Sequence, residues 1–167
     1  NLYTFPLTST GYVRRDAKKA MSEVSQSFIK GQLPDYEIYK MLREAFRGGN
    51  THANRYYTDY TLHNVHSADR SSSYPDVMCN CKFPISEFYR LGNIPYEEVI
   101  KMIGKRQKAC LMRVAITGIY LKRIDWGCPY LSLSKCRYVE NPLIDNGGVI
   151  SADYLETTIT DIDLKIL

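Results

Sequence analysis

Apolar side chains recur at helical spacing in the first third of the chain. Between residues 16 and 30 this pattern predicts a helix that is capped by Asp16 and stopped by Gly31. A second helix is expected to open at Asp35, with apolar positions along one side, and to end in the turn Arg47-Gly48-Gly49-Asn50, where two glycines permit positive φ. The chain therefore begins with helices.

The middle of the chain predicts short elements joined by polar segments. Residues 62–68 are extended enough for a strand. Pro75 suits the first turn of a helix, because it lacks an N–H group that would be unpaired there anyway. We therefore expect a short helix through residue 80, with Ser73 or Tyr74 as its cap.

The second half of the chain changes to an alternating pattern. A short helix over 95–103, closed by Gly104, precedes residues 109–121, where apolar and polar positions alternate as in a half-buried strand. Leu131 and Leu133 mark a further strand, which 136–139 continues.

Turn and cap signals complete this half. Asp145-Asn146-Gly147-Gly148 is a strong turn signal before a returning strand over 154–159. Thr160 followed by Asp163 is similar to a capping box and predicts a helix start. The pattern as a whole predicts an α+β fold, with N-terminal helices followed by an antiparallel sheet.

Composition narrows the class of protein. The chain has 167 residues, of which 44% are hydrophobic and 24% charged, as in soluble globular chains. No apolar run approaches the roughly 20 residues that a bilayer requires, which excludes a membrane span, and the composition excludes a disordered tail or a collagen-like fibre. Residues 1–108 hold 16 basic and 11 acidic side chains, so any electrostatic surface for an anionic partner is expected there. The net charge of +4 permits nucleic-acid binding without requiring it.

The cysteines indicate which cellular compartment to expect, and the ends of the sequence indicate whether it is part of a longer protein. The cysteines are odd in number and include no Cys-x-x-Cys pair, which favours reduced thiols in a cytoplasmic protein: Cys79, Cys81, Cys110, Cys128 and Cys136. The chain opens at Asn1 without a targeting segment, and the helix predicted at Thr160 has about one turn before Leu167. We expect the sequence to be a piece of a longer protein.

Two short motifs carry the chemistry: Phe46-Arg47-Gly48-Gly49 and, about twenty residues on, Asp69-Arg70-Ser71-Ser72-Ser73-Tyr74-Pro75. A carboxylate at a strand end can bind a hard cation. The N–H groups of a tight turn into a helix suit a phosphate. The ring of Tyr74 offers a flat floor for a sugar. A cation, a triphosphate and a sugar are what a nucleotidyl-transfer site must hold.

At these residues the chain resembles the B-family DNA polymerases. Asp-x-x-Ser-x-Tyr-Pro is similar to their first palm motif, and the paired Phe46–Gly49 motif resembles the protein-primed branch found in bacteriophages and linear plasmids. Two weaker similarities lie in the opening residues 6–16 and in the segment 147–164, which resembles the stretch before the fingers. Only residues 46–75 carry a specific motif.

The resemblance implies roles at the second motif. Asp69 would be one of two metal-binding aspartates, and Arg70 would contribute its backbone carbonyl to a metal ion. The serines would bind the incoming triphosphate: Ser71, Ser72 and Ser73. Tyr74 would pack under the deoxyribose and exclude a 2′-hydroxyl. Ser73 departs from the leucine common in the family.

The resemblance also implies a DNA contact at the first motif. Phe46, Arg47, Gly48 and Gly49 would contact the template strand, the glycines admitting phosphates to backbone amides and Arg47 supplying charge. Phe46 stands where the family usually has tyrosine, so it lacks the hydroxyl. Implied partners are primer-template DNA, a deoxynucleoside triphosphate and a terminal protein primer, in the cytoplasm of a bacterial host.

Only half of the implied magnesium site is present. Two-metal catalysis needs a second carboxylate near the first, which the family supplies from a later Asp-Thr-Asp motif. Asp161-x-Asp163 lacks the threonine and lies at a helix start, and the fingers motif is absent. The chain is therefore expected to be inactive alone. We divide it into a helical lead-in (1–47), a palm segment (48–82) and an insertion-like region leading toward the fingers (83–167), part of which would dock the primer protein.

Other interpretations remain open at this stage. Asp69 alone is most often a helix cap or surface acid, Tyr74 a core residue, and Gly48-Gly49 a helix stop. Basic side chains in 14–19 and 101–108 fit a solvated helix face as well as a DNA contact. The chain could therefore be a non-catalytic module that binds nucleic acid or a primer protein, or a structural phage protein that matches the motifs by chance.

Overall fold

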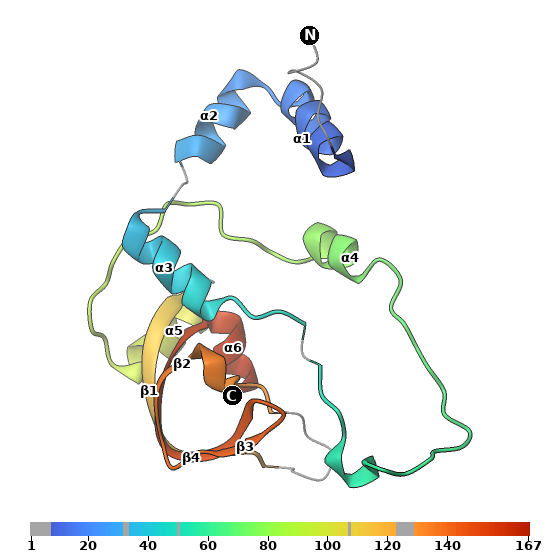
Figure 1. Cartoon of the computed structure of the whole chain (residues 1–167). Helices are drawn as coiled ribbons and strands as arrows, with labels where there is room; N and C mark the ends of the chain where they lie inside the picture. Colours follow the sequence, from blue (N-terminus) through green and yellow to red (C-terminus); the bar gives the residue numbers. More distant parts are fainter. Residues whose placement is uncertain (1–7, 32–33, 50, 107, 123–128) are drawn as a thin grey trace.

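The computed structural model of the chain describes residues 8–31, 34–49, 51–106, 108–122 and 129–167, and it has the predicted α+β architecture (Figure 1). Its α-helices are α1 (Ser9–Ala20), α2 (Glu23–Gly31), α3 (Tyr36–Ala45), α4 (Ser73–Asn80), α5 (Tyr96–Arg106) and α6 (Asp161–Ile166). Its strands are β1 (Leu111–Tyr120), β2 (Cys136–Glu140), β3 (Leu143–Asp145) and β4 (Gly148–Thr160). In the described part of the chain, no helix is long and apolar enough to cross a membrane.

The sheet is antiparallel, and β4 is its centre. The strand order is β1-β4-β2, and β3 also pairs with β4. Leu155 of β4 lies opposite Ile116 of β1 and Val139 of β2, and its side chain is fully buried. Leu131, Val149 and other buried apolar side chains pack around it. The core of the protein is therefore built on β4, late in the chain.

A tight turn joins β3 to β4, as the sequence predicts. Asn146 and Gly147 both have positive φ, at 47° and 77°. Two consecutive residues of this kind match the right-handed twist of a hairpin, and Asn-Gly tolerates them best. Gly148 follows the turn and is buried against Pro129.

We expect Gly148→Ala to destabilise the fold. A Cβ at this position would lie 2.5 Å from Cβ of Pro129, and the proline ring cannot rotate away. Overpacking of this kind costs about 1–3 kcal/mol of the free energy of unfolding, measurable by urea denaturation. Gly49→Ala is the matched control, because Gly49 has open space around it and should stay within about 1 kcal/mol. Equal stability of the two variants would contradict the assigned contact.

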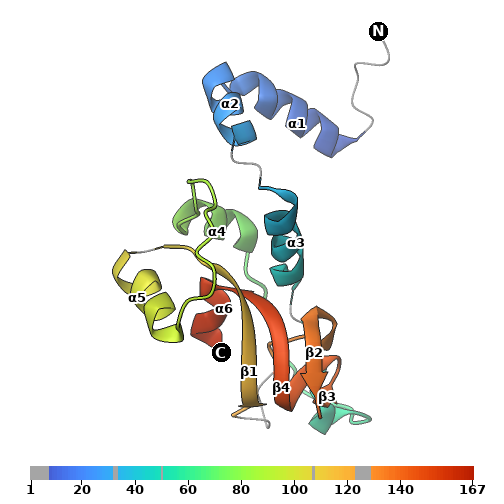
Figure 2. The same ribbon diagram turned by 90° about the vertical axis from the view of Figure 1, so that its left-hand side faces the viewer.

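Helix α3 is held on the sheet by polar contacts near its C-terminal end. The helix starts after Asp35, where the sequence predicts its opening, and the Asp35 side chain is the N-terminal cap, accepting a hydrogen bond from the Ile38 amide at 2.9 Å. Near the other end, Glu44 accepts a 2.7 Å hydrogen bond from the Thr158 hydroxyl of β4. That hydrogen bond, opposed by partial burial and helped by Arg113 and Arg137, lowers the pKa of Glu44. Figure 2 shows α3 leading directly to the upper end of the sheet.

The predicted helix over 16–30 is wrong in its bounds. The chain forms α1 and α2, which are separated at Met21 and Ser22. Thr8 caps α1 through a bond from the Gly11 amide, and Ser22 accepts a bond from the Ser25 amide. The hydroxyl groups of Thr8 and Ser22 therefore cap the starts of α1 and α2, and Asp16 lies inside α1. Both helices extend away from the sheet (Figure 1).

Three further expectations differ from the structure. Residues 62–68 form no strand, since no strand of the described chain lies beside them to pair with. Helix α5 continues through Gly104 to Arg106. Instead of a strand, 131–135 forms an isolated bridge at Ser132 and a 3-10 turn over Leu133–Lys135. The opening residues up to Leu7, together with Asn50 and Cys128, lie outside the described residues.

Candidate functional site

The first candidate element is the segment that leads into α4. Asp69 is exposed at the end of an extended stretch, and its carboxylate makes no hydrogen bond or ion pair with the described residues. Ser72 adopts a left-handed conformation with φ 53°, and α4 begins at the next residue. Ser72 is the N-cap without a side-chain bond, so neither Asp69 nor Ser73 caps the helix. The helix-cap interpretation of Asp69 is therefore wrong, whereas its exposure agrees with the interpretation as a surface acid.

Tyr74 and Arg70, on either side of the serine turn, have different surroundings. Tyr74 is 76% exposed, so it is not a core residue of this chain. Arg70 forms an ion pair with Asp76 of α4, and Asn80 donates to the same carboxylate at 2.6 Å. The side chain of Arg70 is thus tied to α4, whereas Asp69, the serines of the turn and Tyr74 are open to solvent at least in part.

The second candidate element is the segment that follows α3. Phe46 ends α3 in an extended conformation and is 68% exposed. Gly48 and Gly49 have no positive φ, and a Cβ on either would meet nothing within 4 Å. The helix therefore ends at Phe46 without using the glycines, and the helix-stop interpretation of Gly48-Gly49 is wrong. Their conformation would admit a side chain.

Arg47 differs from its neighbours because it points into the protein. Its side chain is only 14% exposed. Nη2 donates to the carbonyl oxygen of Thr158 at 3.3 Å, and Nε lies 3.5 Å from Oδ1 of Asp163. The guanidinium also stacks over Tyr130, with 5.5 Å between Cζ and the ring centroid. Arg47 is therefore not the free surface cation that a template contact was expected to use.

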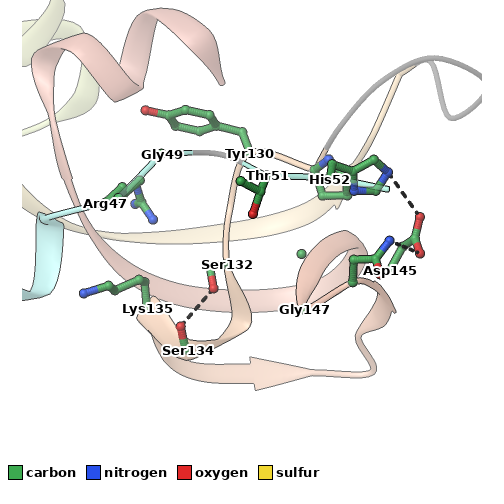
Figure 3. A pocket seen from close by; sticks show the side chains of 14 residues that line it. Arg47, Gly49, Thr51, His52, Tyr130, Ser132, Ser134, Lys135, Asp145 and Gly147 are labelled. Carbon is green, nitrogen blue, oxygen red and sulfur yellow. Dashed lines mark hydrogen bonds and ion pairs between the residues drawn. The ribbon is translucent and has the colours of Figure 1, made fainter. Parts of the chain in front are cut away.

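Arg47, Gly48 and Gly49 line a pocket of about 290 Å³ (Figure 3). The pocket lies between this segment and the turn from β3 to β4. The remaining lining residues are Thr51, His52, Pro129, Tyr130, Ser132, Ser134, Lys135, Asp145, Asn146, Gly147 and Gly148. Hydroxyl groups and small residues dominate the lining, which also holds two cations and the carboxylate of Asp145, a composition suited to a polar group.

Two contacts close the far end of the pocket. Nε2 of His52 lies 3.6 Å from a carboxylate oxygen of Asp145. The side-chain amide of Asn146 donates to the carbonyl oxygen of Ala53 at 3.1 Å. Together these contacts hold the segment after Gly49 against the hairpin turn, as the dashed line in Figure 3 indicates for His52. His52 therefore has a structural partner.

Asp163 is the buried acid behind the pocket wall. It is 5% exposed, and burial alone would raise its pKa. Hydrogen bonds from Tyr130 and Thr160, with the charge of Arg47, outweigh burial and lower the pKa, so Asp163 is ionised at neutral pH. Burial and the same Asp163 raise the pKa of Tyr130 to about 12, so the phenol keeps its proton and remains a donor.

The structure separates the two motifs that the sequence links. No hydrogen bond or ion pair in the described chain joins 69–74 to 46–49, and both views place α4 apart from the hairpin of β3 and β4 (Figures 1 and 2). Within the described residues, no three His, Cys, Asp or Glu side chains are close enough together to hold a metal ion. Asp161 accepts a bond from the Cys110 amide and Asp163 caps α6, so neither completes the site of Asp69.

Sequence reasoning missed the partners of Arg47. The capping box at Thr160 identified Asp163 as a helix cap, and the structure confirms that role. Nothing local indicated that Asp163 would also face Arg47 and Tyr130, because these residues come from distant parts of the chain.

A comparison of the chain with protein-family models, curated proteins and solved structures found no match.

Proposed function

We propose that this chain belongs to the palm of a B-family DNA polymerase of the protein-primed phage type. The full protein would join a primer 3′-hydroxyl to the α-phosphate of a deoxynucleotide with the help of two Mg²⁺ ions. It would act in the cytoplasm of a bacterial host cell. The observation that carries the proposal is the state of Asp69. Its carboxylate is exposed and unengaged, shortly before a left-handed turn into α4, and the exposed Tyr74 follows five residues later.

The residues present fit a magnesium ion only in part. Carboxylate oxygens are the ligands that Mg²⁺ prefers, and the ion usually takes one or two of them together with substrate phosphates. Asp69 would supply one carboxylate and the Arg70 carbonyl a second oxygen. The other aspartate would come from a later part of the full protein.

The segment after Asp69 suits a nucleotide. Ser71 and Ser72 are exposed in the turn before α4, and helix N-termini favour phosphate groups. The ring of Tyr74 lies close by in sequence and is open to solvent, so it can pack against a sugar. We assign the triphosphate to the serine turn and the deoxyribose to Tyr74.

The segment after α3 suits the template strand. Gly48 and Gly49 leave backbone amides accessible at the pocket edge, and Phe46 exposes an aromatic ring on which a base can stack. Lys135 adds charge beside the pocket. The strands within 109–140 would form the framework of the insertion that docks a terminal protein primer.

Tyr74→Val tests the proposed sugar contact. In primer extension by the full-length protein, wild type should incorporate deoxynucleotides and reject ribonucleotides. Loss of the ring should raise ribonucleotide incorporation, relative to deoxynucleotides, by about tenfold or more, because the 2′-hydroxyl no longer meets a barrier. Tyr96→Val is the matched control, since Tyr96 is also an exposed tyrosine at the first turn of a helix. Unchanged selectivity in Tyr74→Val would reject the role, and a wild type without synthesis would reject the function.

A further inference from the structure

The arrangement around Arg47 goes beyond a simple ion pair. Three groups from β4, α6 and the segment before β2 meet one guanidinium: the Thr158 carbonyl, Asp163 and the ring of Tyr130. Nη1 and Nε are buried and have no hydrogen-bond partner in the described chain, although Nε faces Asp163. The side chain thus fills a fixed place in the pocket wall, as Figure 3 shows for Arg47 below Tyr130.

Asp163 determines that place. Its Oδ2 accepts bonds from the backbone N–H and the hydroxyl of Thr160, at 2.7 Å and 2.9 Å. Its Oδ1 accepts the hydroxyl of Tyr130 and faces Arg47. Because both oxygens are engaged in defined directions, the carboxylate cannot rotate without breaking the cap of α6. The position of the negative charge is therefore set by α6.

The energetics favour an inward Arg47. A buried carboxylate without its cation is strongly unfavourable, whereas the pair with additional hydrogen bonds is tolerated. If Arg47 turned outward, Asp163 would keep its bonds from Tyr130 and Thr160 but lose the cation that faces it, and the wall of the pocket would open. Gly48 and Gly49 follow Arg47 directly, so their backbone is placed by the same contacts.

We propose that Asp163 is a positioning residue, which acts through Arg47 to hold Gly48 and Gly49 at the pocket edge in the geometry that binds single-stranded DNA. This inference rests on the proposed function for its ligand. Arg47 then serves as an internal anchor of the DNA-binding segment, and the contacts with phosphates are made by the backbone that it fixes.

A double-mutant cycle in the full-length protein tests this proposal. Asp163→Asn, Arg47→Met and the double variant are compared for melting temperature and for the Kd of a fluorescent oligo(dT) at several salt concentrations. Asp163→Asn should weaken DNA binding by about tenfold in the wild-type background and by less than twofold once Arg47 is methionine. The effect of Asp163→Asn on the melting temperature should likewise be smaller in the Arg47→Met background, because the contact between these two residues is already lost there.

Glu44→Gln is the matched control. Glu44 is also a partly buried acid that contacts β4 and arginine side chains, but it does not line the pocket. It should lower the melting temperature without changing the Kd. Equal effects of Asp163→Asn in both Arg47 backgrounds would overturn the proposal, as would coupling in the melting temperature without coupling in the Kd. A wild type that binds no DNA would reject the proposed function and the positioning role toward DNA with it, even where the melting temperatures are coupled.

Discussion

Asp69→Asn should abolish DNA synthesis by the full-length protein while leaving its melting temperature unchanged. Asparagine keeps the size of the side chain but removes the charge that would hold a metal ion. Loss of a residue that only orients a metal ligand typically lowers metal affinity or activity about 10–100-fold. Removing the ligand itself should therefore lower the rate of synthesis about a thousandfold or more. Because Asp69 is exposed and its carboxylate makes no hydrogen bond or ion pair in the described chain, its replacement removes no such stabilising interaction.

Asp76→Asn is the control for this experiment. Asp76 lies seven residues on, in α4, and its carboxylate is already engaged by Arg70 and Asn80. This variant should retain synthesis within about a few-fold of wild type, since the group is not available to a metal ion. The measurement is primer extension across a magnesium series, with single-stranded DNA binding recorded in parallel.

The same experiment separates the proposed polymerase from the alternative binding module. Loss of synthesis in Asp69→Asn with unchanged DNA affinity supports the catalytic assignment. Near-normal synthesis by the variant would remove Asp69 from catalysis. A wild type that binds DNA but never extends a primer would favour the non-catalytic module, in which Asp69 has no metal to hold.

Leu155→Ala should produce the largest loss of stability in the sheet. Leu155 has 0% exposure and lies between Ile116 and Val139 at the centre of the core. Removing a fully buried leucine side chain leaves a cavity and costs about 3–4 kcal/mol of the free energy of unfolding. Urea denaturation of the 167-residue chain, followed by circular dichroism, measures this difference.

Leu143→Ala is the control, because Leu143 is 53% exposed on β3. It should change the free energy of unfolding by less than about 1 kcal/mol. A loss below about 1 kcal/mol in Leu155→Ala would show that the core does not centre on β4. Since β4 also carries Gly148 and Thr158, a loosened strand should weaken DNA binding as well.

Local signals in the sequence were sufficient for several elements. The helix start at Asp35, the capping box at Thr160 and the Asn-Gly turn before Gly148 each depend on neighbours within four residues, and the structure confirms them. The alternation in β1 likewise predicted a strand. Such features are decided by backbone sterics and short-range hydrogen bonds, which a sequence displays directly.

Local signals also misled where a partner was needed. Residues 62–68 have the composition of a strand, yet an isolated strand leaves its N–H and C=O groups unpaired, and the described chain offers it no neighbour. The helical pattern over 16–30 continued past Met21, but caps at Thr8 and Ser22 divided it. In both cases the apolar pattern alone did not decide the outcome.

The sequence by itself determined which candidate groups the proposed function uses: the acid, serine turn and tyrosine of 69–74, and the two glycines after α3. Only the tertiary structure decided that Arg47 turns inward, because its partners Thr158 and Asp163 come from the far end of the chain. The tertiary structure also formed the pocket, by placing the segment after Gly49 against the hairpin turn at Asp145. Charges and hydrogen-bonding groups are properties of single residues, whereas burial and pairing arise only when distant segments pack together.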